Sequence, residues 1–300
     1  MSIGKDDILH QDFRVRHATR LIMIVAGYKR ELWPLTLLRI KEHAPADSDV
    51  CVVSPGKAEP ELIDACRAMG WSFLATKANK LALAQNLAME LHPAAEWIHK
   101  LDEDIVVAAG YFESLEATFH HALEVDECRV GFVAPTLNVN GFSYRSFLKF
   151  VAPAKLIEFR TRFGDSRSSC VDTAAWREPQ AAQFLWEQSL PFDPLAALFL
   201  SRPPGYDICP HRFSIGAIFF HRTLWTDSGT FTVAREGLLG VEEADLCKFC
   251  CDRARLMLVS HNTFAGHVGF FSQAAHMIPW LTARDINLPA QPILSVRQAA

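Results

Sequence analysis

The stretch EWIHKLDED, residues 96–104, decides the fold, because a short apolar strand runs directly into three carboxylates. Similar apolar runs occur at 21–26 (LIMIVA), 49–54 (DVCVVS) and 71–75 (WSFLA), and the stretches between them have helical spacing or composition. Strands that alternate with helices predict parallel strands joined by right-handed crossovers. Ligands of such sheets bind at the carboxyl ends of the strands. We therefore expect an α/β fold with its ligand at residues 102–104.

The overall composition favours a small ligand over a nucleic acid. Half of the 300 residues are apolar, and the net charge of −4 arises from nearly balanced charges, which give no general attraction to nucleic acid. The eight cysteines are scattered and lie mostly in apolar segments, and no secretory signal is recognised, so we expect reduced thiols and a cytoplasmic location. No run approaches the roughly 20 apolar residues that a membrane-spanning helix needs. The sequence thus predicts a soluble or peripheral protein.

The second half of the chain is less regular. Further strands are expected at 129–134, 213–220 and 256–259, and a helix that opens on an acidic turn is expected within 237–255. The segment 138–212 mixes Phe, Pro, Arg and Trp without a clean period, which predicts an inserted, partly helical segment that shapes specificity.

The acidic cluster has two interpretations. Asp102 and Asp104 are two positions apart at a strand end, so both can face one ligand, and carboxylate oxygens suit Mg²⁺ or Mn²⁺. Acidic triplets are also common in solvated turns. The position after an apolar strand in an alternating α/β pattern favours the metal.

Two later motifs add candidate groups. GVEEADL, residues 240–246, places Glu242, Glu243 and Asp245 at the start of a helix, where they either complement the helix dipole or supply a general base. His261 and His267 lie in or after a predicted strand, where a histidine either completes a metal shell or packs against its neighbours.

The order of these motifs resembles the family 2 type of GT-A glycosyltransferases. The series runs from the strand at 21–26 through NKLALAQN (79–86), KLDED (100–104) and GVEEADL to His267, and the resemblance covers about 20–137 and 213–272. It implies a GT-A fold, an α/β arrangement with a mixed, mainly parallel sheet flanked by helices. The domain division that follows is an N-terminal tail (1–20), a catalytic domain (21–272) and a C-terminal tail (273–300). Within the catalytic domain it gives a nucleotide-sugar-binding half (21–137), the insert (138–212) and an acceptor half (213–272).

The resemblance also implies roles for single residues and a donor, a nucleoside-diphosphate sugar. The metal, Mn²⁺ or Mg²⁺, would be held by Asp102, Asp104 and His267, with His261 as the less fitting histidine and Glu103 without a direct part. The nucleotide would contact Ala26, Tyr28, Ser54, Asn79, Lys80, Asn86 and Asp102. Glu243 takes the position of the catalytic base, although the family usually has Asp there, so Glu242 and Asp245 remain alternatives. The family implies inversion at the anomeric carbon.

Two rival functions remain open. A nucleotidyltransferase or another metal-dependent phosphoryl-transfer enzyme would use the same carboxylates, but Gly27-Tyr28-Lys29-Arg30 is not a glycine-rich phosphate loop. An inactive GT-A-like binding module is the other rival, suggested by the substitution at Glu243. The acceptor is expected to be a carbohydrate, glycolipid or protein, with peripheral contact at the inner face of a membrane as a family-level expectation.

Overall fold

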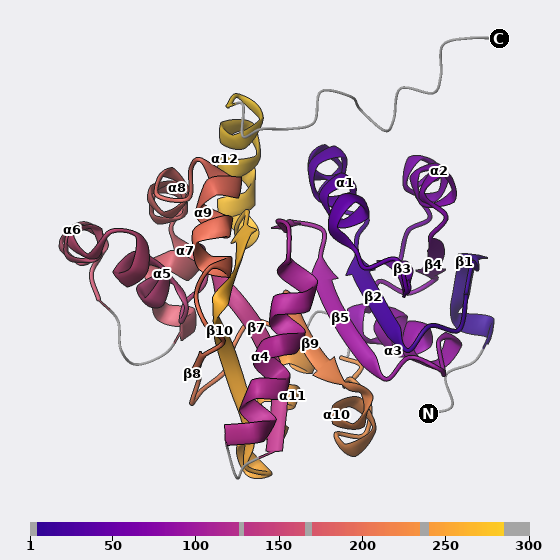
Figure 1. Cartoon of the computed structure of the whole chain (residues 1–300). Helices are drawn as coiled ribbons and strands as arrows, with labels where there is room; N and C mark the ends of the chain where they lie inside the picture. Colours follow the sequence, from indigo (N-terminus) through magenta and orange to yellow (C-terminus); the bar gives the residue numbers. More distant parts are fainter. Residues whose placement is uncertain (1–4, 126–128, 166–169, 235–239, 285–300) are drawn as a thin grey trace.

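The computed structural model describes residues 5–125, 129–165, 170–234 and 240–284 (Figure 1). Within these residues the strands form one ten-stranded sheet in the order β1-β4-β3-β2-β5-β9-β7-β10-β6, with β8 paired to β10. The strands are β1 (Ile8–Asp12), β2 (Arg20–Val25), β3 (Ser48–Pro55), β4 (Ser72–Thr76), β5 (Trp97–Asp102), β6 (Ile105–Val106), β7 (Arg129–Leu137), β8 (Tyr206–Ile208), β9 (Ala217–His221) and β10 (Arg255–His267).

The strand directions bring distant parts of the chain to one edge of the sheet. β2 pairs in parallel with β3 and β5, β3 pairs in parallel with β4, and β7 pairs in parallel with β10. β9 lies antiparallel between β5 and β7, so β7 and β10 point the same way as β5. The predicted mixed, mainly parallel sheet is confirmed. The strands β2, β5 and β10 end at the carboxyl edge of the sheet. β9 runs the other way and begins at this edge.

The helices cover both faces of the sheet. They are α1 (Trp33–His43), α2 (Pro60–Met69), α3 (Leu81–Leu91), α4 (Tyr111–Val125), α5 (Tyr144–Val151), α6 (Pro153–Phe163), α7 (Ala174–Arg177), α8 (Pro179–Glu187), α9 (Phe192–Leu200), α10 (Arg222–Asp227), α11 (Val241–Asp252) and α12 (Phe271–Thr282), with short 3₁₀ turns at Lys5–Asp7, Arg30–Leu32 and Cys170–Asp172. Side chains of α1, α2 and α4 share one apolar core, and those of α3, α10 and α11 share another on the opposite face. The sheet is therefore the middle layer of three.

The insert has a core of its own. Helices α5 to α9 pack around Phe147 and Trp186, together with Phe264 of β10 and residues of α12. In Figure 1 these helices gather on one side of the molecule, beside the end of β10. The partly helical insert expected from the sequence is thus present as a compact helical layer.

The two segments predicted as tails contain regular secondary structure in the described part of the chain. Ile8–Asp12 is strand β1, which pairs antiparallel with β4 and extends the sheet at that edge. It escaped prediction because its burial alternates and it has no continuous apolar run. Phe271–Thr282 is helix α12, which packs on α8 although Pro279 lies inside it. Residues 1–4 and 285–300 of the predicted tails lie outside the described residues.

Local boundaries also differ from those expected. The strand predicted at 213–220 begins only at Ala217, so residues 213–216 form a loop at the carboxyl edge. The helix expected within 237–255 is α11 as far as the structure describes it, with 237–239 outside the described residues. Among the described residues, no helix is both long enough and apolar enough to cross a membrane.

Candidate functional site

Glu103 fixes the loop that follows β2. Its buried carboxylate accepts hydrogen bonds from the backbone N–H of Gly27 (2.9 Å) and Tyr28 (3.0 Å) and from the indole N–H of Trp33 (2.6 Å). Gly27 has a φ of +135°, and a Cβ there would come within 2.5 Å of Ser54 Oγ, so glycine is required. Burial raises the pKa of Glu103 despite these donors. No direct ligand role was expected for Glu103, and its role in positioning this loop was not predicted.

Asp104 is a buried carboxylate with two partners from distant segments. Its Oδ2 forms an ion pair with Lys29 Nζ and lies 3.3 Å from His267 Nε2. Burial alone would raise the pKa of Asp104, but the charges and hydrogen bonds of Lys29 and His267 outweigh it and hold that pKa far below its usual range. Burial lowers the pKa of Lys29, and the Asp104 charge more than reverses this.

The donor set at Asp104 fits a divalent cation. His267 Nδ1 lies 2.7 Å from the carbonyl oxygen of Val139, which can only accept, so Nδ1 carries the proton. Nε2 is thus the ring nitrogen on the side of Asp104, and in the neutral ring its lone pair would be free to bind a cation shared with that carboxylate. Carboxylate oxygens suit Mn²⁺ and Mg²⁺, and an imidazole beside them favours the less hard Mn²⁺ of the two. A carbonyl partner on the second ring nitrogen is typical of metal-binding histidines.

Asp102 lies apart from this pair. Its Oδ1 accepts a hydrogen bond from Lys100 Nζ (2.5 Å), and Lys100 also donates to the carbonyl oxygen of Ile215 (2.8 Å). A Cβ at Gly216 would lie 3.0 Å from Asp102 Oδ2, so that side chain faces the 213–216 loop. Within the described residues no three His, Cys, Asp or Glu side chains are placed to hold a metal. The expected three-residue set of Asp102, Asp104 and His267 is therefore not assembled.

Glu243 reaches the same loop from the other side. Its Oε1 accepts from Arg212 Nε (2.6 Å) and its Oε2 from the backbone N–H of Ile215 (3.3 Å). Burial raises the pKa of Glu243, and Arg212 offsets part of that rise. Ile215 thus contacts both residues: its N–H donates to Glu243, the candidate base, and its carbonyl oxygen accepts from Lys100.

Glu242 and Asp245 point elsewhere. They line a small cavity of about 20 Å³ together with Thr230 and Phe231 of the segment after α10. Helix α11 therefore places Glu243 against the loop beside Asp102. The two alternative bases, Glu242 and Asp245, face the segment after α10.

Tyr28 and Asn79 meet at the ends of β3 and β4. Tyr28 Oη donates to the carbonyl oxygen of Pro55 (2.7 Å), and Asn79 lies against the following residue, because a Cβ at Gly56 would come within 2.8 Å of Asn79 Cβ. Lys57 Nζ lies 4.4 Å from the centre of the Tyr28 ring. About half of Tyr28 is exposed, so an aromatic surface is available beside polar groups.

Ala26 and Ser54 are fully buried beneath that surface. Ala26 N–H donates to the carbonyl oxygen of Val53 (2.9 Å), and Ser54 Oγ is a buried atom without a hydrogen-bond partner among the described residues. Ser54 thus has a hydroxyl that is unpaired within the described part of the chain and lies buried against Gly27.

The two candidate residues of the NKLALAQN segment, Lys80 and Asn86, have different surroundings. Lys80 precedes α3 and is partly exposed. Both ends of the buried Asn86 amide are engaged, because Nδ2 donates to the Phe231 carbonyl (2.8 Å) and Oδ1 accepts from Trp225 Nε1 (2.9 Å) and the Phe231 N–H (3.0 Å). Asn86 therefore anchors the segment after α10 in this structure.

His261 is placed differently from His267. Its Nε2 lies 3.0 Å from Asp207 of β8, whereas His267 is the histidine beside Asp104. The histidine beside Asp104 is thus the one that the resemblance favours.

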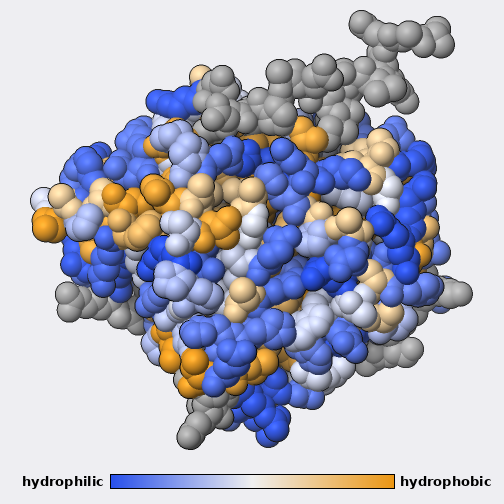
Figure 2. Space-filling view, viewed as in Figure 1, coloured by the Kyte–Doolittle hydropathy of each residue, from blue (hydrophilic) through white to orange (hydrophobic). Residues whose placement is uncertain are grey.

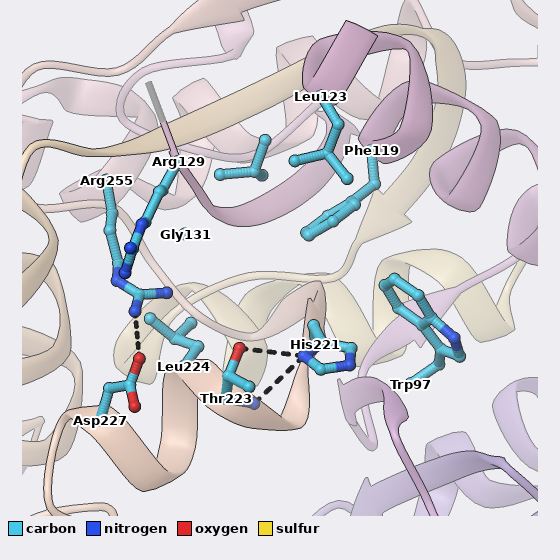
Figure 3. Close-up of a pocket in the computed structure, with 11 residues that line it drawn as sticks. Trp97, Phe119, Leu123, Arg129, Gly131, His221, Thr223, Leu224, Asp227 and Arg255 are labelled. Carbon is cyan, nitrogen blue, oxygen red and sulfur yellow. Dashed lines mark hydrogen bonds and ion pairs between the residues drawn. The ribbon is translucent and has the colours of Figure 1, made fainter. Parts of the chain in front are cut away.

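A further cavity lies at the opposite edge of the sheet. It encloses about 420 Å³ and is lined by the first residues of β5, β7 and β10 (Trp97, Arg129 and Arg255), with His221 at the end of β9 and Asp227 of α10 (Figure 3). Asp227 forms an ion pair with Arg255 there. These are the amino ends of the parallel strands, so this cavity is separate from the carboxylates of 102–104.

Comparison with known proteins bears on the fold. No protein-family model and no curated protein matches the chain. Among solved structures, the mannosyltransferase PcManGT from Pyrobaculum calidifontis, in complex with GDP-Man and Mn²⁺, is similar with a TM-score of 0.51 at 15% identity, over 94% of this chain and 69% of that one. S. aureus TarS 1–349 has a TM-score of 0.49 at 8% identity, over 83% of this chain and 60% of that one. The chain has the Rossmann-like fold of a glycosyltransferase.

Proposed function

We propose that this protein is a glycosyltransferase that moves a sugar from a nucleoside-diphosphate sugar to an acceptor hydroxyl. The observation that carries the proposal is the meeting of Asp104, His267 and Lys29 at the end of β5, with Glu243 buried beside the same strand end. A fold shared with a mannosyltransferase supports this interpretation. The proposed donor is a nucleoside-diphosphate sugar because the proposed cation site at Asp104 and the aromatic surface of Tyr28 border the same carboxyl edge of the sheet.

Asp104 and His267 would hold the divalent cation, Mn²⁺ or Mg²⁺, in the proposed enzyme. Such an ion supplies positive charge to the departing diphosphate. Because the described residues offer two ligands rather than three, the diphosphate and water must complete the coordination, as is usual for Mg²⁺ at phosphate sites. Metal and nucleotide are therefore expected to bind together far more tightly than either alone.

Tyr28, Ser54 and Asn79 would receive the nucleoside part of the donor. The exposed Tyr28 ring offers a stacking surface and the exposed Asn79 amide offers hydrogen bonds, while Ser54 Oγ, unpaired among the described residues, lies buried behind Gly27. Asp102, with Lys100 beside it, would face the ribose. Ala26 would contribute only its backbone to this part of the site. Lys80, just before α3, and Asn86, within α3, would stabilise the nucleotide-binding half.

Glu243 would act as the general base. Burial raises its pKa, which makes the ionised form a stronger proton acceptor than an ordinary glutamate. It would take the proton from the acceptor hydroxyl as that oxygen attacks the anomeric carbon, and the diphosphate would leave from the opposite face. One such displacement inverts the anomeric configuration.

The insert would meet the acceptor, a carbohydrate, glycolipid or protein. Exposed apolar side chains gather there, namely Phe150, Ile157, Leu198, Leu200 and Ile208. Figure 2 shows an apolar band over this side of the molecule. Such a surface favours a lipid-linked acceptor at a membrane over a free sugar.

A panel of nucleotide sugars, offered with Mn²⁺, with Mg²⁺ and with EDTA, tests the proposal. We expect at least one donor to raise the melting temperature in a metal-dependent way and to release its nucleoside diphosphate in the presence of acceptor. Release of pyrophosphate from a nucleoside triphosphate would instead indicate a nucleotidyltransferase. Binding without any turnover would indicate an inactive module, and no stabilisation by any nucleoside diphosphate would refute the proposal.

A further inference from the structure

Asp104 contacts two nitrogen atoms through one oxygen atom. Lys29 Nζ and His267 Nε2 both approach Oδ2 of this buried carboxylate. The backbone holds Lys29 in this position, because Glu103 accepts hydrogen bonds from the N–H groups of the two preceding residues. Its side chain is about one quarter exposed, so it can also reach outward.

An ammonium group and a divalent cation cannot both contact that oxygen without strong repulsion. His267 Nε2 and the Asp104 carboxylate would hold the divalent ion, whereas in the free protein Lys29 neutralises the same carboxylate. Lys29 would therefore have to leave Oδ2 of Asp104 for a divalent ion to bind that oxygen. The displaced ammonium needs a new anionic partner, and a diphosphate bound to that ion would lie within reach.

We propose that Lys29 is the resident counter-ion of Asp104 in the free protein and becomes a ligand of the donor diphosphate when the metal-bound donor enters. This inference rests on the proposed function and adds a residue to its donor site. Lysine is well suited to the exchange, since its flexible stem carries a point charge that binds either a carboxylate or a phosphate. Metal and Lys29 thus compete in the free protein and cooperate on the diphosphate.

The exchange predicts two effects of opposite sign for Lys29→Met. Without nucleotide, Mn²⁺ should bind about tenfold more tightly than to the wild type, because its competitor is gone; Mn²⁺ electron paramagnetic resonance measures this. With saturating Mn²⁺, UDP and GDP should bind about tenfold more weakly in calorimetry, because a phosphate contact is lost. Lys155→Met, which removes an exposed lysine paired with Glu158, should change neither affinity.

Lys29→Gln guards against a folding defect, because an amide can still donate to the buried Asp104 while carrying no charge. It should show the same two effects, and circular dichroism should show a native fold. Unchanged affinities in both assays would overturn the inference, and so would a loss of both, which indicates only structural support. If the wild type binds no nucleoside diphosphate, the proposed function and the diphosphate role fail together, and the Mn²⁺ assay still decides whether Lys29 competes for Asp104.

Discussion

His267 Nε2 lies 3.3 Å from Asp104 Oδ2 although the two residues belong to opposite halves of the chain. The backbone fixes their approach, because β6 and β10 pair with His267 opposite Ile105 and the N–H of Val268 donates to the carbonyl of Asp104 (3.0 Å). The pair is thus built by the sheet itself rather than by mobile side chains.

Asp104→Asn should remove metal-dependent nucleotide binding. The amide keeps the volume of the side chain but loses the charge that a cation requires, so we expect the affinity for UDP or GDP in Mn²⁺ to fall by about 100-fold or more. Calorimetry with and without EDTA measures the change. Asp47→Asn, an exposed control, should bind as the wild type does; an equal loss in both variants would contradict the assignment.

Glu243→Gln should separate binding from transfer. The amide cannot accept the hydroxyl proton, so we expect kcat to fall by about 10²–10⁴-fold while donor affinity stays within about twofold. Glu242→Gln and Asp245→Asn serve as matched controls from the same helix. Full activity in Glu243→Gln, or a larger loss in either control, would show that the base has been misassigned.

The pH profile should report the environment of Glu243. The base works only when ionised, so activity should decline at acidic pH, starting above the range of an ordinary glutamate because burial raises its pKa. Arg212→Gln removes a charge that lowers this pKa and should move the acidic limb of kcat/KM to higher pH. Arg162→Gln, an exposed control, should leave the limb in place. A limb that stays put in Arg212→Gln would argue against Glu243 as the titrating group.

Glu103→Gln should destabilise the loop after β2. An amide nitrogen would face the N–H donors that now bind the carboxylate, so the free energy of unfolding should drop by about 1–3 kcal/mol in chemical denaturation. Trp33→Phe should show a smaller loss, since it removes one of these bonds. Glu90→Gln, on an exposed position of α3, should stay within about 0.5 kcal/mol of the wild type.

The local sequence pattern was sufficient to predict most strands of the sheet. The apolar runs at 21–26, 49–54, 71–75 and 129–134 all lie in strands, because a buried strand needs consecutive apolar residues whatever its neighbours are. β1, β6 and β8 were missed, since the first has alternating burial and the other two are two and three residues long. The insert was expected to be only partly helical, because its helices bury aromatic residues against one another without a regular period.

Sequence by itself determined the fold class and the set of candidate side chains, because strand and helix periodicity is written in residues close together in the chain. Tertiary structure decided which candidates meet: His267 rather than His261 beside Asp104, Glu243 rather than Glu242 or Asp245 beside the 213–216 loop, and Asp102 with Lys100. It also revealed Lys29 and Glu103 as parts of the site. These contacts depend on strand order and register, which join distant segments and leave no mark on local spacing.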